Sequence, residues 1–419
     1  MPIRVGSIAR RAILGAAAAL MLGAAFAQAT PYLVVDAGSG QVLLQNEATA
    51  PWYPASLTKL MTVYVALNAV RSGKLTLDTP LIMSARAARM PPSKMGFRPG
   101  TEVTLDNALK MLMVKSPNDV AVMVAEGVSG SIEAFADDMN GAAQRLGLRE
   151  SHFVNPNGLH NPAHVSSARD MALIALALFR EFPDHADLFD IGALQLGNRY
   201  IPNHNGLLGR YPGADGMKTG FTCPAGFNVV ASASRSGRHL IVVVLGAPTA
   251  RSRNVEAAEL FDRGFAMSGG GGSLEALPQG SGAPPNMRAD VCLHRSAALI
   301  AAAEEEGLGD SSQGDAAPAN PLTALFAPAA AARTELPSGR IRFDPVPVYI
   351  GPAPGWKGPA LGPRGVEAAG ASQSDDAAPT VRHRPRRKFR VKAVHHPATA
   401  AKALETHGGE NPPTQVGQQ

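Results

Sequence analysis

Two side chains near residue 57 have the types and the spacing for nucleophilic catalysis. Ser56 can supply a hydroxyl nucleophile, and Lys59 follows three residues later. The apolar positions of this stretch have helical period and predict an amphipathic helix, in which these two side chains share a face: Leu57, Leu60, Met61, Tyr64 and Val65. A neutral lysine amine could take the serine proton, and the unpaired N–H groups at the helix start would favour an oxyanion. Because serine is also an ordinary helix cap, the pair alone does not establish catalysis.

Two further motifs follow in the chain. Ser116-Pro117-Asn118 lies between two helical patterns, and taken alone this triplet favours Ser116 as the cap of the helix that begins at Asp119. Lys218-Thr219-Gly220 opens a strand-rich section. Each motif is weak alone. In this order, however, Ser-x-x-Lys, Ser-x-Asn and Lys-Thr-Gly form the set found in penicillin-binding proteins and class A β-lactamases.

The elements that must position these motifs are strands at both ends of a helical region. Turn-forming residues predict one hairpin over 32–44 and a second over 227–245. Helical patterns cover the ranges 105–114, 119–128, 132–146 and 254–265, and a capping box at Ser167 starts another helix. This order predicts an α+β fold, with helices packed on an antiparallel sheet and a helical subdomain.

The first 29 residues have the layout of a secretory signal peptide. Arginines at 4, 10 and 11 precede an apolar run, and small residues allow cleavage after Ala27 or Ala29. A membrane anchor is the alternative, but the run is short for a span of about 20 residues. Arg10-Arg11 matches a twin-arginine signal only loosely. We therefore expect export, to the periplasm or the cell surface.

Residues 267–419 form a predicted tail. They hold 18 of the 34 prolines, so we expect a low-complexity, largely disordered region with a short helix at 295–306. Residues 341–350 could form an isolated strand or a docking segment. The two cysteines, Cys223 and Cys292, make no disulfide framework, and since Cys292 falls in the tail we do not expect them to be bridged.

Charge and histidine spacing limit the possible ligands. The net charge of +5 owes much to basic residues within 382–392, which favour a solvated tail with peripheral envelope contact over nucleic-acid binding in an exported protein. His160 and His164 have i, i+4 spacing, but Pro162 between them breaks a helix. We interpret both as loop histidines and expect neither a metal nor a cofactor.

With its three motifs in this order, the chain resembles the serine D-alanyl-D-alanine carboxypeptidases, the low-molecular-mass penicillin-binding proteins. The resemblance runs from about residue 30 to 266, and the sequence around the motifs supports it at 54–62, 155–159, 164–171, 203–208 and 218–222. It implies a fold like that of β-lactamases and penicillin-binding proteins. The expected division is a signal peptide at 1–29, a catalytic domain at 30–266 and the tail at 267–419.

The resemblance assigns acylation to the first two motifs. Ser56 would be the acylated nucleophile, and Lys59 the base that activates it. Ser116 would relay a proton to the departing D-alanine, while Asn118 would bind the peptide and orient Lys59. The backbone N–H groups of Ser56 and Phe221 would form the oxyanion hole.

The resemblance assigns substrate binding to the third motif and a later arginine. Lys218 would supply positive potential, and Thr219, in the motif that ends at Gly220, would contact the terminal carboxylate of the substrate. Arg253 lies 35 residues after Lys218 and resembles the family arginine near that carboxylate. Phe221 stands where many relatives carry histidine, so the wall beside the oxyanion hole should be more apolar.

The activity implied is removal of the terminal D-alanine from peptidoglycan stem pentapeptides, with β-lactams as covalent inhibitors. A D,D-endopeptidase and a β-lactamase are the enzymatic alternatives, although no clear Glu-x-x-Leu-Asn segment would serve the latter. A catalytically silent peptidoglycan-binding scaffold protein is the alternative of another class. The complete set of nucleophile, base and carboxylate-binding residues argues against it.

Overall fold

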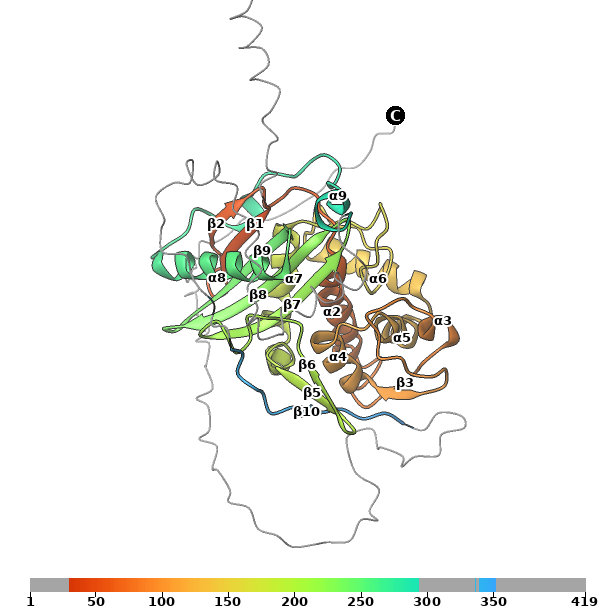
Figure 1. Cartoon of the computed structure of the whole chain (residues 1–419). Coiled ribbons are helices and arrows are strands. Elements are labelled where there is room, and N and C mark those ends of the chain that lie inside the picture. Colours follow the sequence, from red (N-terminus) through yellow and green to blue (C-terminus); the bar gives the residue numbers. More distant parts are fainter. Residues whose placement is uncertain (1–29, 294–335, 337–338, 352–419) are drawn as a thin grey trace, which may run out of the picture. The chain divides into compact units, whose positions relative to one another are not determined.

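A five-stranded antiparallel sheet forms the centre of the fold (Figure 1). The computed structural model describes residues 30–293, 336 and 339–351. The strand order is β2-β1-β9-β8-β7, with these bounds: β1 Tyr32–Asp36, β2 Val42–Asn46, β7 Ala214–Thr222, β8 Gly226–Arg235 and β9 Arg238–Ala247. Both predicted hairpins are confirmed. Because β1 pairs with β9, the first strands of the domain are joined to its last.

Helices cover both faces of this sheet. α8 (Ala250–Ala266) packs on one face, where Val242 and Val244 belong to its core. α7 (Ala168–Glu181) lies on the other, where Ile241 and Val243 join the larger core. The alternation follows from the two-residue period of a strand, and it explains why β9 is apolar without a break from residue 240 to 245.

The helix after Ser56 differs from its prediction. Ser56 lies in a single 3₁₀ turn, η2 (Ala55–Leu57), which leads into α2 (Thr58–Arg71). α2 is buried on all sides from residue 58 to 67 rather than amphipathic. Its polar face is buried because hydrogen bonds satisfy it: for example, the Thr62 hydroxyl donates to Pro156 O at 2.6 Å.

The helical subdomain surrounds α2. It comprises α4 (Leu105–Val114), α5 (Asn118–Ser129) and α6 (Ile132–Arg145), close to the predicted ranges. Three short elements lie beside them: β3 Pro80–Ile82, α3 Ala85–Ala88 and β4 Glu102–Thr104. At the start of α7, Ser167 Oγ accepts a hydrogen bond from Asp170 N, which confirms the predicted helix start.

A second small sheet was not predicted. η3 (Pro183–Leu188) leads into β5 (Ala193–Leu196) and β6 (Arg199–Pro202), which pair antiparallel. β10 (Val346–Pro347) adds to β5 in parallel, so the segment expected at 341–350 is a docked one.

The expectation that the two cysteines are not bridged is wrong. Cys223 and Cys292 form a disulfide. The bridge forms because residues 267–293, with η4 (Leu274–Ala276) and α9 (Arg288–Val291), pack back on the domain: Val42 N donates to Gly272 O, and Met287 N donates to Pro224 O.

Several predictions lie outside the described residues: the signal peptide at 1–29, the helix at 295–306 and the basic residues within 382–392. Among the residues that are described, no helix has the length and apolarity needed to cross a membrane.

Candidate active site

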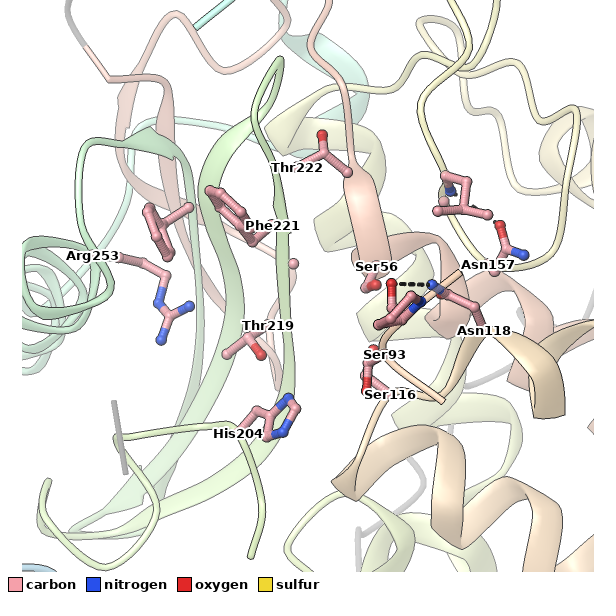
Figure 2. Close-up of a pocket in the computed structure, with 15 residues that line it drawn as sticks. Ser56, Ser93, Ser116, Asn118, Asn157, His204, Thr219, Phe221, Thr222 and Arg253 are labelled. Carbon is pink, nitrogen blue, oxygen red and sulfur yellow. Dashed lines mark hydrogen bonds between the residues drawn. The ribbon is translucent and has the colours of Figure 1, made fainter. Parts of the chain in front are cut away.

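The three motifs meet at one cleft of about 270 Å³. In Figure 2, Ser56, Ser116 and Asn118 lie on one side of it and Thr219, Phe221 and Arg253 on the other. η2, the turn before α5, strand β7 and helix α8 supply these residues, and loops add Ser93, Asn157 and His204. Positions far apart in the sequence are thus brought together as the motif order predicts.

Lys59 connects the first two motifs. Its amine is 2.9 Å from Ser56 Oγ, 2.9 Å from Asn118 Oδ1 and 2.8 Å from Asn157 O, and the side chain has no exposed surface. A neutral amine has two protons to donate to the two carbonyl oxygens, so its lone pair would face the Ser56 hydroxyl. Burial also disfavours the charged form of an amine. This geometry suits a base that takes the serine proton.

The backbone around Ser56 is held from three sides. Asn228 Nδ2 donates to Pro54 O at 3.2 Å, and Ala55 has a left-handed φ of 48°. Gly158 lies so close that a Cβ there would be 1.8 Å from Ala55 O. On the remaining side, a Cβ on Gly220 would come within 3.0 Å of Ser56 N. Glycine in the third motif therefore allows β7 to approach the nucleophile's backbone.

The middle motif is a turn rather than a cap. Ser116 has a φ of 59°, and α5 starts after Pro117 without a side-chain cap, so the capping interpretation of Ser116 is wrong. Within the described part of the chain, the buried Ser116 Oγ has no hydrogen-bond partner. Asn118 Nδ2 donates to Pro91 O and Pro92 O, both at 3.1 Å, which turns its Oδ1 toward Lys59.

The opposite wall carries cations and one aromatic side chain. Lys218 is buried, and its amine donates to Thr219 O at 2.7 Å. Arg253 is also buried and donates to Asn254 Oδ1 from Nε and Nη2. Phe221 stacks on Phe227 with ring centroids 4.2 Å apart, which gives the wall its apolar part.

His204 is a cleft residue that the sequence did not single out. It lies at one end of the labelled side chains (Figure 2). Burial, and after it the nearby charges of Lys115, Lys218 and Arg253, lower its pKa to about 3. The imidazole is therefore neutral at ordinary pH. Only its place within the family-like segment 203–208 could have pointed to it.

The charge of the cleft has one sign. Arg253 lines the cleft, and Lys218 is buried beneath its wall. Among the residues described, no Asp or Glu lines the cleft. Fixed cations in a partly closed cleft favour an anionic ligand, and a terminal carboxylate is one such group.

The two loop histidines have structural contacts. His164 Nδ1 accepts from Val154 N at 3.1 Å, so its Nε2 carries the proton that faces Thr58 Oγ1 at 2.8 Å. Burial lowers the pKa of His164 to about 3. His160 packs edge-on against Tyr53. In the part of the chain that can be described, no three His, Cys, Asp or Glu side chains gather as a metal site would need.

Comparison with known proteins points to one family. A family model described as D-alanyl-D-alanine carboxypeptidase matches residues 21–249. D-alanyl-D-alanine carboxypeptidase DacA of Haemophilus influenzae is 38% identical over 243 residues, which are 57% of this chain and 62% of that protein. The chain thus spans about three fifths of the length of this relative.

Solved structures share the fold. Penicillin-binding protein 5 from Haemophilus influenzae has a TM-score of 0.55 and 38% identity, over 56% of this chain and 70% of that one. Penicillin-binding protein D2 from Listeria monocytogenes, solved in its ampicillin-bound form, has a TM-score of 0.52 and 27% identity, over 57% of this chain and 99% of that one. An antiparallel sheet flanked by helices is thus the fold of this chain and of penicillin-binding proteins.

Proposed function

Because this chain belongs to the family of D-alanyl-D-alanine carboxypeptidases, we propose that it removes the terminal D-alanine from peptidoglycan stem pentapeptides through an acyl-enzyme on Ser56. The contact between Lys59 Nζ and Ser56 Oγ, at 2.9 Å and with two carbonyl oxygens holding the same amine, carries the proposal. It is the arrangement that a lysine-activated serine requires.

Acylation starts when Ser56 Oγ attacks the carbonyl carbon of the penultimate D-alanine and its proton passes to Lys59. The backbone N–H groups of Ser56 and Phe221 hold the oxyanion, which the close approach of Gly220 to Ser56 N supports. The C–N bond then breaks, and D-alanine leaves with a proton relayed by Ser116. Water hydrolyses the ester, with Lys59 as base, and Ser56 recovers its proton.

Substrate selection rests on the wall opposite Ser56. Thr219 and Arg253 bind the terminal carboxylate, and Lys218 adds positive potential from beneath the strand. A β-lactam carries a carboxylate beside its reactive carbonyl, so it enters the same cleft and acylates Ser56 as a covalent inhibitor. The ampicillin-bound form of the Listeria monocytogenes relative supports this part of the proposal. Export to the periplasm or cell surface, with envelope contact through the basic residues within 382–392, completes it.

A paired assay tests the activity. Purified full-length protein is incubated with labelled penicillin and, separately, with a pentapeptide that ends in D-Ala-D-Ala. We expect covalent labelling and release of D-alanine from the wild type, loss of both in Ser56→Ala, and no loss in Ser129→Ala, the last residue of α5, which does not line the cleft.

Three other results would favour another function. Rapid penicillin turnover without peptide cleavage would indicate a β-lactamase, and cleavage of cross-linked dimers without D-alanine release would indicate an endopeptidase. Neither labelling nor release would contradict the proposal and favour a silent peptidoglycan-binding protein.

A further inference from the structure

A segment from the far end of the described chain lies on the loop that carries His204. Residues 339–351 run beside β5 and β6, where β10 pairs with β5 (Figure 1). Val348 is buried, and its N–H donates to Gln195 O at 2.9 Å. The segment ends on β4, where Gly351 N donates to Glu102 O at 2.7 Å. It is therefore bound along its length rather than at one contact.

Arg340 joins this segment to the 203–208 loop by three hydrogen bonds. Its Nη1 donates to Asn203 O at 2.7 Å, Nη2 to Asn205 O at 3.0 Å and Nε to Leu208 O at 2.9 Å. A guanidinium presents donors in a rigid planar fork, so it fits three carbonyl oxygens only if the loop holds one curled shape. Burial lowers the pKa of Arg340 to about 10, which still leaves it charged at neutral pH.

Phe343 fixes the place of that fork. Its ring lies against two glycines: a Cβ on Gly192 would be 2.0 Å from the ring, and one on Gly209 would be 2.9 Å from it. Arg340 stacks over the same ring, 5.3 Å from its centroid. A side chain at residue 192 or 209 would exclude the Phe343 ring. The two glycines therefore allow the segment to pack beside the 203–208 loop.

The clamped loop is hydrogen-bonded to the two segments that lead into the walls of the cleft. His204 lines the cleft and lies in the sequence between Asn203 and Asn205, whose carbonyls Arg340 binds. The backbone N–H of His204 donates to Val114 O, two residues before Ser116. Asn205 Nδ2 donates to Gly216 O on β7, two residues before Lys218. A shift of this loop would therefore change the spacing between the Ser116 turn and the third motif.

We propose that Arg340 is a positioning residue for the peptidase reaction: it clamps the 203–208 loop and so holds His204 and the two walls of the cleft at the spacing that substrate requires. The inference rests on the proposed function for its kinetic part. Arg340 itself does not line the cleft, so it acts only through the loop.

The test compares Arg340→Ala with Arg342→Ala in the full-length protein. Arg342 is exposed on the same segment, lies over the Tyr200 ring and makes none of the three loop contacts, so the control removes the same charge. We expect Arg340→Ala to lower the second-order rate constant of penicillin acylation about tenfold, with a matching rise in KM for the D-Ala-D-Ala peptide. Amide hydrogen exchange should become faster in 203–211. Arg342→Ala should stay within about twofold of the wild type, and Arg340→Lys, with one point charge, should recover only part of the loss.

The outcomes separate the clamp from the proposed function. Rate constants are taken per acylable site, so a variant that merely folds less well loses active fraction and thermal midpoint while those constants stay unchanged; this result would overturn the inference. Unchanged constants and unchanged exchange would overturn it too. If the wild type is not acylated at all, the proposed function fails, and exchange alone decides: faster exchange in 203–211 for Arg340→Ala but not for Arg342→Ala supports the clamp, and equal exchange refutes it.

Discussion

Asn118 shows how single residues of this cleft are fixed from several directions. Both protons of its amide point to backbone carbonyls of the loop before it, so only Oδ1 faces Lys59. Since Asn157 O also accepts from the Lys59 amine, the base has a fixed position before any substrate enters.

Arg253→Ala tests the carboxylate site at this scale. Charge-assisted hydrogen bonds are worth about 1.5–3 kcal/mol, so we expect kcat/KM for a peptide with a free terminal carboxylate to fall roughly 10- to 100-fold. Acylation by a neutral ester should fall much less, because it has no carboxylate to bind. Arg251→Ala, an exposed arginine on the same helix, is the control. Equal losses for both reagents would assign Arg253 to its structural contact with Asn254.

The order of the motifs was enough to place Ser56, Lys59, Ser116, Asn118 and Lys218 around one cleft. It could not supply His204 or Asn157, because their places depend on loops whose course is set by packing far from the motifs. The roles carried over from the family remain predictions. Asn157 contributes a backbone oxygen, which no side-chain pattern reveals.

At the scale of elements, β7 is the strand on which the substrate wall depends. Its partner β8 was predicted from its β-rich sequence, as part of the hairpin over 227–245. The apolar period of α2 predicted one buried face, and it missed that hydrogen bonds bury the polar face as well. The disulfide was missed because proline and glycine content does not show that residues 267–293 pack back on the domain.

Reduction of the Cys223–Cys292 bridge should destabilise the protein. The bridge spans 69 residues and follows Thr222 at the end of β7. Chain-entropy arguments give a loss of about 4 kcal/mol in the free energy of unfolding. Urea unfolding with and without a reductant measures it, and a Cys223→Ala, Cys292→Ala double variant should be insensitive to reductant. Equal midpoints for the oxidised and reduced wild type would show that the bridge adds no stability.

For the whole molecule, buried titratable groups link stability to pH in opposite directions. His164 and His204 stay neutral in the folded chain, since burial lowers the pKa of each to about 3. Burial raises the pKa of Asp170 to about 6, and the negative charge of Glu150 beside it acts in the same direction. Between about pH 4 and 6 the folded state holds the Asp170 proton, so this group favours stability at the acidic end. Burial also raises the pKa of Glu256 to about 7, so two carboxyl groups favour the acidic end and the two histidines favour the neutral end.

We expect the contribution of each buried histidine to the free energy of unfolding to fall as pH falls from 6.5 to 5. In that range an unfolded histidine gains a proton that His164 and His204 refuse when folded, and each contributes about 1.4 kcal/mol per pH unit. Urea unfolding at pH 7 and pH 5 measures the difference. His164→Asn removes one proton site, so its loss between the two pH values should be smaller by about 2 kcal/mol, whatever its stability at pH 7. His185→Asn on η3 is the control and should keep the wild-type dependence. Equal changes in stability on acidification for His164→Asn and the wild type would contradict this prediction. They would mean that the imidazole of His164 is protonated in the folded wild type, which conflicts with the hydrogen bond that Nδ1 accepts from Val154 N.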